Sequence, residues 1–142
     1  MKRDTTRLFC NIHPLGALGT YKYVVVLSRE GDEILLSRRR DRETWETQGG
    51  HVEPGETPMD AARRELYEES GALEFDISPL CDYFGYDDTS SSNGMVFVAG
   101  IRRRGPLPES EMAEARTFSA LPEHLTYPNV TPALFAYAET HR

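Results

Sequence analysis

A helix with both ends marked in the sequence is the feature that most constrains this chain. Thr57 is a suitable N-cap, Pro58 suits the first helical position, and Asp60 can complete a capping box with Thr57. Gly71 suits the C-terminal stop, because glycine readily adopts the left-handed conformation that commonly ends a helix. The sequence therefore predicts a helix over residues 58–70, entered from a loop.

Three glutamates of this helix lie on one side of it. Glu65, Glu68 and Glu69 are spaced i, i+3, i+4, which brings their side chains together. The pair Gly49–Gly50 precedes the loop, and glycine allows close backbone approach. Carboxylates grouped beside such a backbone are what a hard divalent cation needs. The alternative is a solvated acidic face, since each like-charge pair on an exposed helix costs only about 0.2–0.5 kcal/mol.

Strand-like segments on both sides of the helix predict a mixed sheet. Residues 22–28 form an apolar run typical of a buried strand, and residues 33–39 suit its hairpin partner across the turn at Gly31–Asp32. Further strands are predicted within 74–86, at 95–102 and at 115–119, and a last helix over 131–139. Because strands and helices are interspersed, we expect the sheet to lie between helices.

Two local expectations accompany this outline. Residues 87–94 are polar and are expected to form a mobile loop. On the helix, an apolar stripe is expected to face the core. Its members are Met59, Ala62, Leu66 and Leu73.

Length, charge and cysteine content narrow the class of protein. The 142 residues, 39% of them hydrophobic, suit a single domain over 1–142. The net charge of −7 disfavours binding to long nucleic acid, which requires a basic face. The longest apolar run, residues 23–27, is too short to cross a membrane. Cys10 and Cys81 lie far apart in sequence and favour reduced thiols in a cytoplasmic protein.

Residues 50–72 resemble the signature box of the Nudix hydrolases, Gly-x5-Glu-x7-Arg-Glu-U-x-Glu-Glu-x-Gly-U, in which U is a bulky aliphatic residue. Ala72 fits the last position weakly, and Leu73 follows it and can fill the space. Many fixed positions at fixed spacing make this a specific motif. The matching residues are Gly50, Glu56, Arg64, Glu65, Leu66, Glu68, Glu69 and Gly71.

The resemblance implies an α/β/α sandwich with a mixed sheet, in which the box forms a loop–helix–loop. It also implies hydrolysis of a nucleoside diphosphate linked to another group, with Mg²⁺ or Mn²⁺ as cofactor. Carried over by position, the implied metal ligands are the Gly49 carbonyl, Glu65, Glu68 and Glu69. Glu111 is the first choice for an additional glutamate from a later loop, ahead of Glu114 and Glu109.

Glu56 and Arg64 resemble the family's pair that shapes the loop and holds the helix. The substrate-binding candidates lie on or near the glycine pair. They are Arg38, Trp45, Gln48, Gly50 and His51. Gln48 stands where many family members have proline, and it either bonds to a base or phosphate or fills the loop.

The favoured substrate is a small nucleotide, as in the MutT-type hydrolases of oxidised nucleoside triphosphates. The alternatives are an ADP-ribose or nucleotide-sugar pyrophosphatase and, outside the enzymes, a nucleotide-sensing module. Hydrolysis of RNA 5′ ends is disfavoured by the acidic balance. A homodimer is compatible with the sequence, which identifies no pairing surface.

Overall fold

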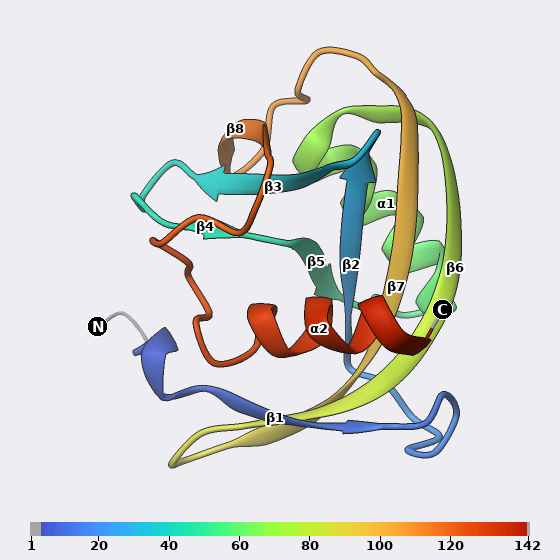
Figure 1. Cartoon of the computed structure of the whole chain (residues 1–142). Helices are drawn as coiled ribbons and strands as arrows, with labels where there is room; N and C mark the ends of the chain where they lie inside the picture. Colours follow the sequence, from blue (N-terminus) through green and yellow to red (C-terminus); the bar gives the residue numbers. More distant parts are fainter. Residues whose placement is uncertain (1–3, 142) are drawn as a thin grey trace.

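A computed structural model describes residues 4–141. Two α-helices, one short 3-10 helix and eight strands follow one another along the chain (Figure 1). In order they are η1 (Thr5–Arg7), β1 (Phe9–His13), β2 (Tyr23–Glu30), β3 (Glu33–Arg39), β4 (Trp45–Glu46), β5 (Gln48–His51), α1 (Pro58–Ser70), β6 (Ala72–Tyr86), β7 (Ser91–Arg104), β8 (Met112–Phe118) and α2 (Thr131–His141).

The strands form one mixed sheet with a helix on each side. The main path runs β1-β6-β7-β2-β3-β4, while β5 also pairs with β2 and β8 with β3. The β2–β7 pair is parallel and the other pairs are antiparallel. In Figure 1, α1 lies behind the sheet and α2 in front of it. The expected α/β/α sandwich with a mixed sheet is confirmed.

Alternating side chains of the strands build two separate cores. On β3, Leu35 packs in the cluster that contains Ala62 and Leu66 of α1. Its neighbours Ile34 and Leu36 pack in the cluster that contains α2. The two-residue period of a strand therefore supplies both helices from the same segment.

Strand β2 pairs with different partners at its two ends. Its first half pairs with β5, so that Val24 lies opposite Gly50 and Val25 opposite Gly49. Its second half pairs with β3, beginning at Ser28. Because α1 packs against β5, the glycine pair is held between the centre of the sheet and this helix.

The predicted helix is confirmed at both ends. The Thr57 hydroxyl accepts a hydrogen bond from the Asp60 N–H at 3.1 Å, and the Asp60 carboxylate accepts one from the Thr57 N–H at 3.1 Å. Gly71 ends the helix with a φ of 77°. The expectation that Leu73 faces the core is wrong, because Leu73 is 43% exposed and Ala72 is buried in its place.

Other strands differ from the prediction. β1 was not predicted, since its sequence alternates too weakly to stand out. Residues 91–94, expected in a loop, begin β7 and pair with β6. Only residues 87–90 make the turn, where the Asp87 carboxylate accepts hydrogen bonds from the Thr89 and Ser90 N–H groups.

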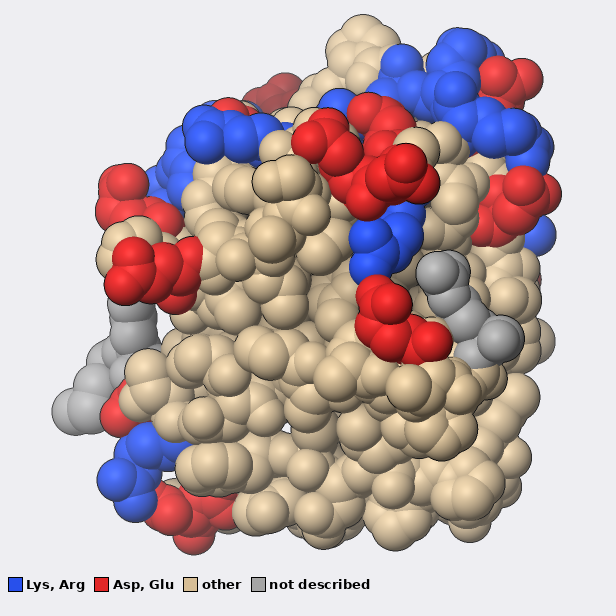
Figure 2. Space-filling model, in the orientation of Figure 1, with Lys and Arg blue, Asp and Glu red and all other residues tan. Residues whose placement is uncertain are grey.

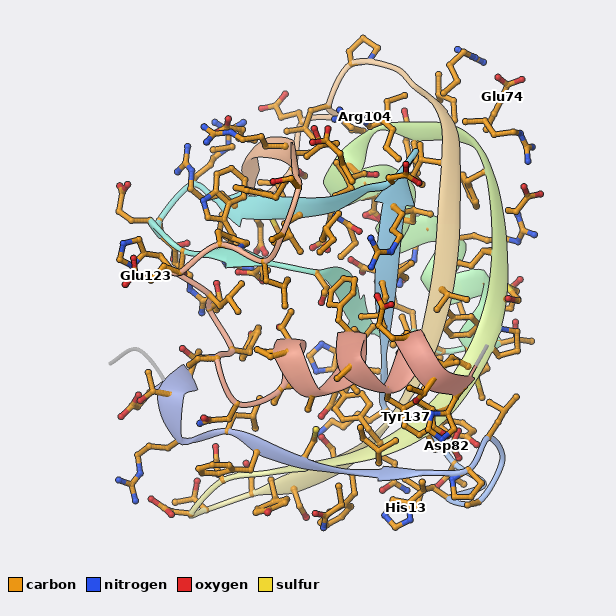
Figure 3. The ribbon with its side chains drawn as sticks, in the orientation of Figure 1. His13, Glu74, Asp82, Arg104, Glu123 and Tyr137 are labelled. Atoms are coloured by element: carbon orange, nitrogen blue, oxygen red, sulfur yellow. The ribbon has the colours of Figure 1, made fainter. Side chains whose placement is uncertain are left out.

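The segment between β1 and β2 is anchored to a buried carboxylate. Asp82 accepts hydrogen bonds from the Leu18 N–H at 3.0 Å and the Tyr21 hydroxyl at 2.6 Å. Figure 3 places Asp82 beside His13, its partner in the β1–β6 register. This contact fixes the chain that enters β2.

Charged side chains on the face in Figure 2 gather along the top of the molecule, while the surface over α2 is largely uncharged. Acidic and basic groups are intermixed there, in agreement with ion pairs such as Arg39–Glu111 and Arg104–Glu30. No helix within residues 4–141 has the length and apolar character needed to cross a bilayer.

Candidate active site

Helix α1 presents its acidic side chains towards the glycine pair of β5. Ala61, Ala62 and Leu66 bury one face of the helix against the sheet. The glutamates at 65, 68 and 69 lie beside that buried face, with a graded exposure. The Glu65 side chain is 14% exposed and that of Glu68 42%.

Glu69 joins the helix directly to the glycine pair. Its carboxylate accepts a hydrogen bond from the Gly49 N–H at 2.8 Å. Its backbone carbonyl accepts one from the Ser37 hydroxyl at 2.7 Å. Burial raises the pKa of Glu69 to about 9, with smaller contributions from Glu65 and Glu46. A carboxyl group in this position stays ionised at neutral pH only when a positive charge lies next to it.

Glu65 lies against the second glycine. A Cβ added to Gly50 would lie 2.6 Å from the carboxylate carbon of Glu65, so only glycine leaves room for that carboxylate. Burial raises the pKa of Glu65, and hydrogen bonding to Arg64 opposes this effect.

Arg64 links the loop to the acidic side of α1. Its Nε and Nη2 donate to the two oxygens of Glu56 at 2.7 and 2.9 Å, a bidentate pair. Its Nη1 donates to Glu65 at 2.6 Å and to Glu68 at 3.1 Å. Its Nη2 also donates to the carbonyl of His51 at 3.0 Å. The hydrogen bonds from Arg64 lower the pKa of Glu56 to about 2.

The donor set suits a hard divalent cation. Carboxylate oxygens of Glu65, Glu68 and Glu69 lie along one edge of α1, and such oxygens are the ligands that Mg²⁺ and Mn²⁺ prefer. Within residues 4–141, no three acidic, histidine or cysteine side chains are gathered tightly enough to form a ligand group as they stand. Arg64 bridges Glu65 and Glu68 instead. The residues fit such an ion chemically, because a cation beside the buried Glu69 would favour the ionised form of its carboxyl group.

The structure does not bring Glu111 into the same group. Its side chain is 74% exposed and accepts a hydrogen bond from Arg39 at 2.7 Å, just before β8. Glu114, the second choice, pairs with Arg38 and Arg116. Both glutamates lie along the β3–β8 pair rather than on the α1 edge.

Two substrate-binding candidates are used inside the fold. The Gln48 side chain is fully buried: it accepts from the Ser28 hydroxyl and donates to the Ser37 hydroxyl and the Leu35 carbonyl. Both polar atoms of this side chain are thus bonded within the protein, which favours the loop-filling alternative. Trp45 is also buried, with its ring 4.9 Å from that of Phe118, and is a core residue.

Arg38 is held by three partners near the end of β3. Its guanidinium donates to the carbonyls of Arg39 and Arg42 and to Glu114. Gly50 and His51, in contrast, border an open cavity, and the His51 ring meets that of Tyr23 edge-on at 6.4 Å. These two predicted residues are well placed to meet a ligand.

The cavity has a volume of about 310 Å³ and begins at the glycine pair. Its wall is formed by the start of β2, residues 46–51, Tyr83 of β6, Ser90–Ser92 and the start of α2. Ligand pockets in proteins occupy about 300–1,000 Å³, so the size suits a small organic group. Glu46, Tyr83 and Ser90–Ser92 were not predicted; an acidic residue next to the glycine pair was the one available signal.

Comparison with known proteins finds similarity in sequence over most of this chain. A family model described as the NUDIX domain matches residues 21–132. An RNA pyrophosphohydrolase of Francisella philomiragia is 39% identical over 67 residues, 45% of this chain and 43% of its own length. A putative 8-oxo-dGTP diphosphatase of Bacillus subtilis is 47% identical over 49 residues, 34% of this chain and 32% of its own length. The chain thus matches less than half the length of these curated relatives.

Solved structures share the fold. The pyrophosphohydrolase BsRppH of Bacillus subtilis superposes with a TM-score of 0.79 at 23% identity, covering 93% of this chain and 89% of that one. An ADP-ribose pyrophosphatase of Streptococcus suis superposes with a TM-score of 0.63 at 18% identity, covering 84% and 91%. At these identities the likeness establishes the architecture alone.

Proposed function

This chain belongs to the Nudix family, and we propose that it is a divalent-metal-dependent hydrolase of nucleoside triphosphates. Water attacks a phosphorus of the polyphosphate, the phosphoanhydride bond breaks, and a nucleoside monophosphate and pyrophosphate leave. The observation that carries this proposal is the packing of Glu65 and Glu69 against the Gly49–Gly50 bend at the mouth of a cavity.

Glu65, Glu68, Glu69 and the Gly49 carbonyl are the residues we assign to Mg²⁺ or Mn²⁺. When bound, such a cation neutralises phosphate oxygens and makes a water molecule more acidic. A carboxylate of this set takes the proton of the attacking water. Glu111 is a candidate additional ligand, for which it would have to exchange its ion pair with Arg39.

Arg64 and Glu56 act as positioning residues. Their bidentate pair ties the loop before α1 to the helix, and the remaining Arg64 N–H groups align Glu65 and Glu68. The cavity would receive the nucleoside, because it opens next to the place where the polyphosphate must lie. His51 lines the entrance. The partner we expect is therefore a small nucleotide. We propose that the protein acts in the cytoplasm.

A second candidate is hydrolysis at the 5′ end of RNA. What favours it is the likeness in sequence to an RNA pyrophosphohydrolase, which is 39% identical over 67 residues. The chemistry at phosphorus is the same, so the two candidates differ only in what is attached to the nucleotide.

A substrate screen with product analysis tests the proposal. Nucleoside triphosphates, 8-oxo-dGTP, ADP-ribose, UDP-sugars and a 5′-triphosphorylated oligonucleotide are each incubated with Mg²⁺ and with Mn²⁺. We expect turnover of a triphosphate with release of pyrophosphate, abolished by a chelator and strongly reduced in Glu68→Gln. Glu74→Gln, an exposed carboxylate paired with Arg103, is the matched control.

Other results would redirect the proposal. Turnover of ADP-ribose or UDP-sugars alone would replace the triphosphate with a nucleotide sugar. Metal-dependent binding of a nucleotide without turnover in wild type would instead identify a sensing module.

A further inference from the structure

We propose that Glu46 is a specificity-determining residue, which accepts hydrogen bonds from the N1–H and the 2-amino group of a guanine-type base in the cavity beside the glycine pair. This inference rests on the proposed nucleotide hydrolysis and names the base that the site selects.

Glu46 is a buried acidic side chain on the wall of the cavity. It is 8% exposed, and it borders the same space as Gly49, Gly50 and His51. A carboxylate loses much of its hydration when it is buried to this degree, so it needs polar partners. The partners it has inside the protein reach only one of its two oxygens.

That oxygen, Oε1, accepts hydrogen bonds from Arg42 Nη1 at 3.2 Å and from the Thr126 hydroxyl at 3.0 Å. The second oxygen of Glu46, Oε2, accepts no hydrogen bond from any group within residues 4–141. One half of the carboxylate is therefore fixed by the protein, while the other half keeps its acceptor capacity for a ligand.

The surrounding contacts hold Glu46 rigidly. Thr126 accepts from the Thr44 hydroxyl at 2.7 Å, which leaves the Thr126 proton for Glu46. The Thr126 N–H donates to the Trp45 carbonyl at 2.9 Å, so this network is tied to β4 itself. A preorganised acceptor discriminates better between ligands than a mobile one, because little ordering is needed on binding.

The chemistry of the free oxygen favours one purine. Burial raises the pKa of Glu46, and the hydrogen bonds from Thr126 and Arg42 oppose this effect by stabilising the ionised form. An ionised carboxylate only accepts hydrogen bonds, and the guanine edge presents two adjacent N–H donors, N1–H and the 2-amino group. Adenine offers an amino donor beside the lone pair of N1, which a carboxylate repels. The aromatic side chains of Tyr83 and Tyr127 on the cavity wall supply apolar surface for the rest of the base.

The first test changes the substrate rather than the protein. Inosine triphosphate lacks only the 2-amino group of GTP, so the two substrates isolate one hydrogen bond. We expect wild-type kcat/KM for GTP to exceed that for ITP by about tenfold or more, the usual effect of a hydrogen bond to a charged group. If RNA is the substrate, the same comparison uses triphosphorylated oligonucleotides that begin with G or I. Equal values for the two would overturn the proposal.

The second test is Glu46→Gln. Arg42 and Thr126 both donate, so they will hold the amide oxygen and turn its NH₂ group towards the cavity. A donor there opposes guanine and suits the N1 of adenine. We expect kcat/KM for GTP to fall about tenfold or more, kcat/KM for ATP to stay level or rise, and the GTP/ITP ratio to approach one.

The controls separate this inference from the proposed function. Glu43→Gln makes the same change at an exposed carboxylate three residues away and should leave the selectivity unchanged. The Mg²⁺ concentration for half-maximal rate should be the same in wild type and Glu46→Gln; a large increase would make Glu46 a metal-site residue and refute base reading. If Glu46→Gln turns over nucleotides with the selectivity of wild type, the inference about Glu46 is refuted but the hydrolase function stands. If wild type turns over no nucleotide, the hydrolase function itself is refuted.

Discussion

Alanine substitutions of the adjacent residues Gly49 and Gly50 are expected to have different effects. Gly49→Ala should mainly lower stability, and Gly50→Ala should mainly lower catalytic activity. At Gly49, a Cβ would collide with the carbonyl oxygen of Val24 in the central strand β2. Backbone cannot yield there without disturbing the β2–β5 pairing, so we expect a loss of about 1–3 kcal/mol. For a chain of this length that corresponds to a fall in Tm of roughly 3–12 °C.

At Gly50 the obstacle is of another kind. A Cβ would lie 2.6 Å from the Glu65 carboxylate, which is the end of a flexible side chain and can rotate away. The cost in stability should stay below about 1.5 kcal/mol, the scale of a shifted rotamer. The displaced carboxylate should nevertheless lower kcat about 100-fold, because misplacement by about 1 Å in an active site has effects of that size.

Thermal unfolding and steady-state kinetics at saturating Mg²⁺ measure the two effects on the same preparations. Gly100→Ala serves as the control, since a Cβ there meets no atom within 4 Å. The reasoning is refuted if Gly50→Ala retains the wild-type kcat, or if Gly50→Ala lowers Tm more than Gly49→Ala does.

Four further predictions rest on the charges of the site and on the thiols. Arg64→Lys should lower kcat about 10- to 100-fold, because lysine cannot bind Glu56 bidentately while aligning the acidic helix edge; recovery of full activity by lysine would contradict this. Since burial raises the pKa of Glu69 to about 9, the metal-free protein carries its proton at pH 7; metal binding should release about one proton, measured by calorimetry in two buffers, and Glu69→Gln should release none. The same shift means that the metal-free protein loses stability as pH rises from the ordinary glutamate pKa towards 9, which urea unfolding at several pH values will show. Burial raises the pKa of Cys81 to about 12 and also that of Cys10, so both free thiols should react slowly with a thiol reagent at pH 8 until the protein is unfolded.

Features encoded by neighbouring residues could be predicted from the sequence. The capping box, the first helical proline and the terminal glycine fixed α1 because each acts within one or two turns of the helix. The strand at 33–39 was predicted with its observed bounds for the same reason, since its apolar run at residues 34–36 and the turn before it are local signals.

Features that depend on distant partners were not predictable in the same way. β1 is a strand because β6 pairs with it, from a segment more than 60 residues later. Ser91–Gly94 have poor strand propensity and extend β7 only because β6 lies opposite. Leu73 was expected inside, but the chain reverses its side-chain direction where α1 gives way to β6, so that Ala72 takes the buried place.

The same distinction between local and distant features applies to the site. The i, i+3, i+4 spacing is enough to place three carboxylates on one helix edge, and Arg64 on the same helix reaches Glu65 and Glu68 without help from the rest of the fold. The cavity, in contrast, joins β2, β4, β6 and the start of α2, which no local pattern relates to each other. Glu46 becomes a candidate only when Thr126, 80 positions later, is found bonded to it. In the function we propose, phosphate chemistry depends on a local motif and base selection on tertiary contacts. We therefore expect substitutions of cavity residues to change the preferred base while the helix edge keeps its geometry.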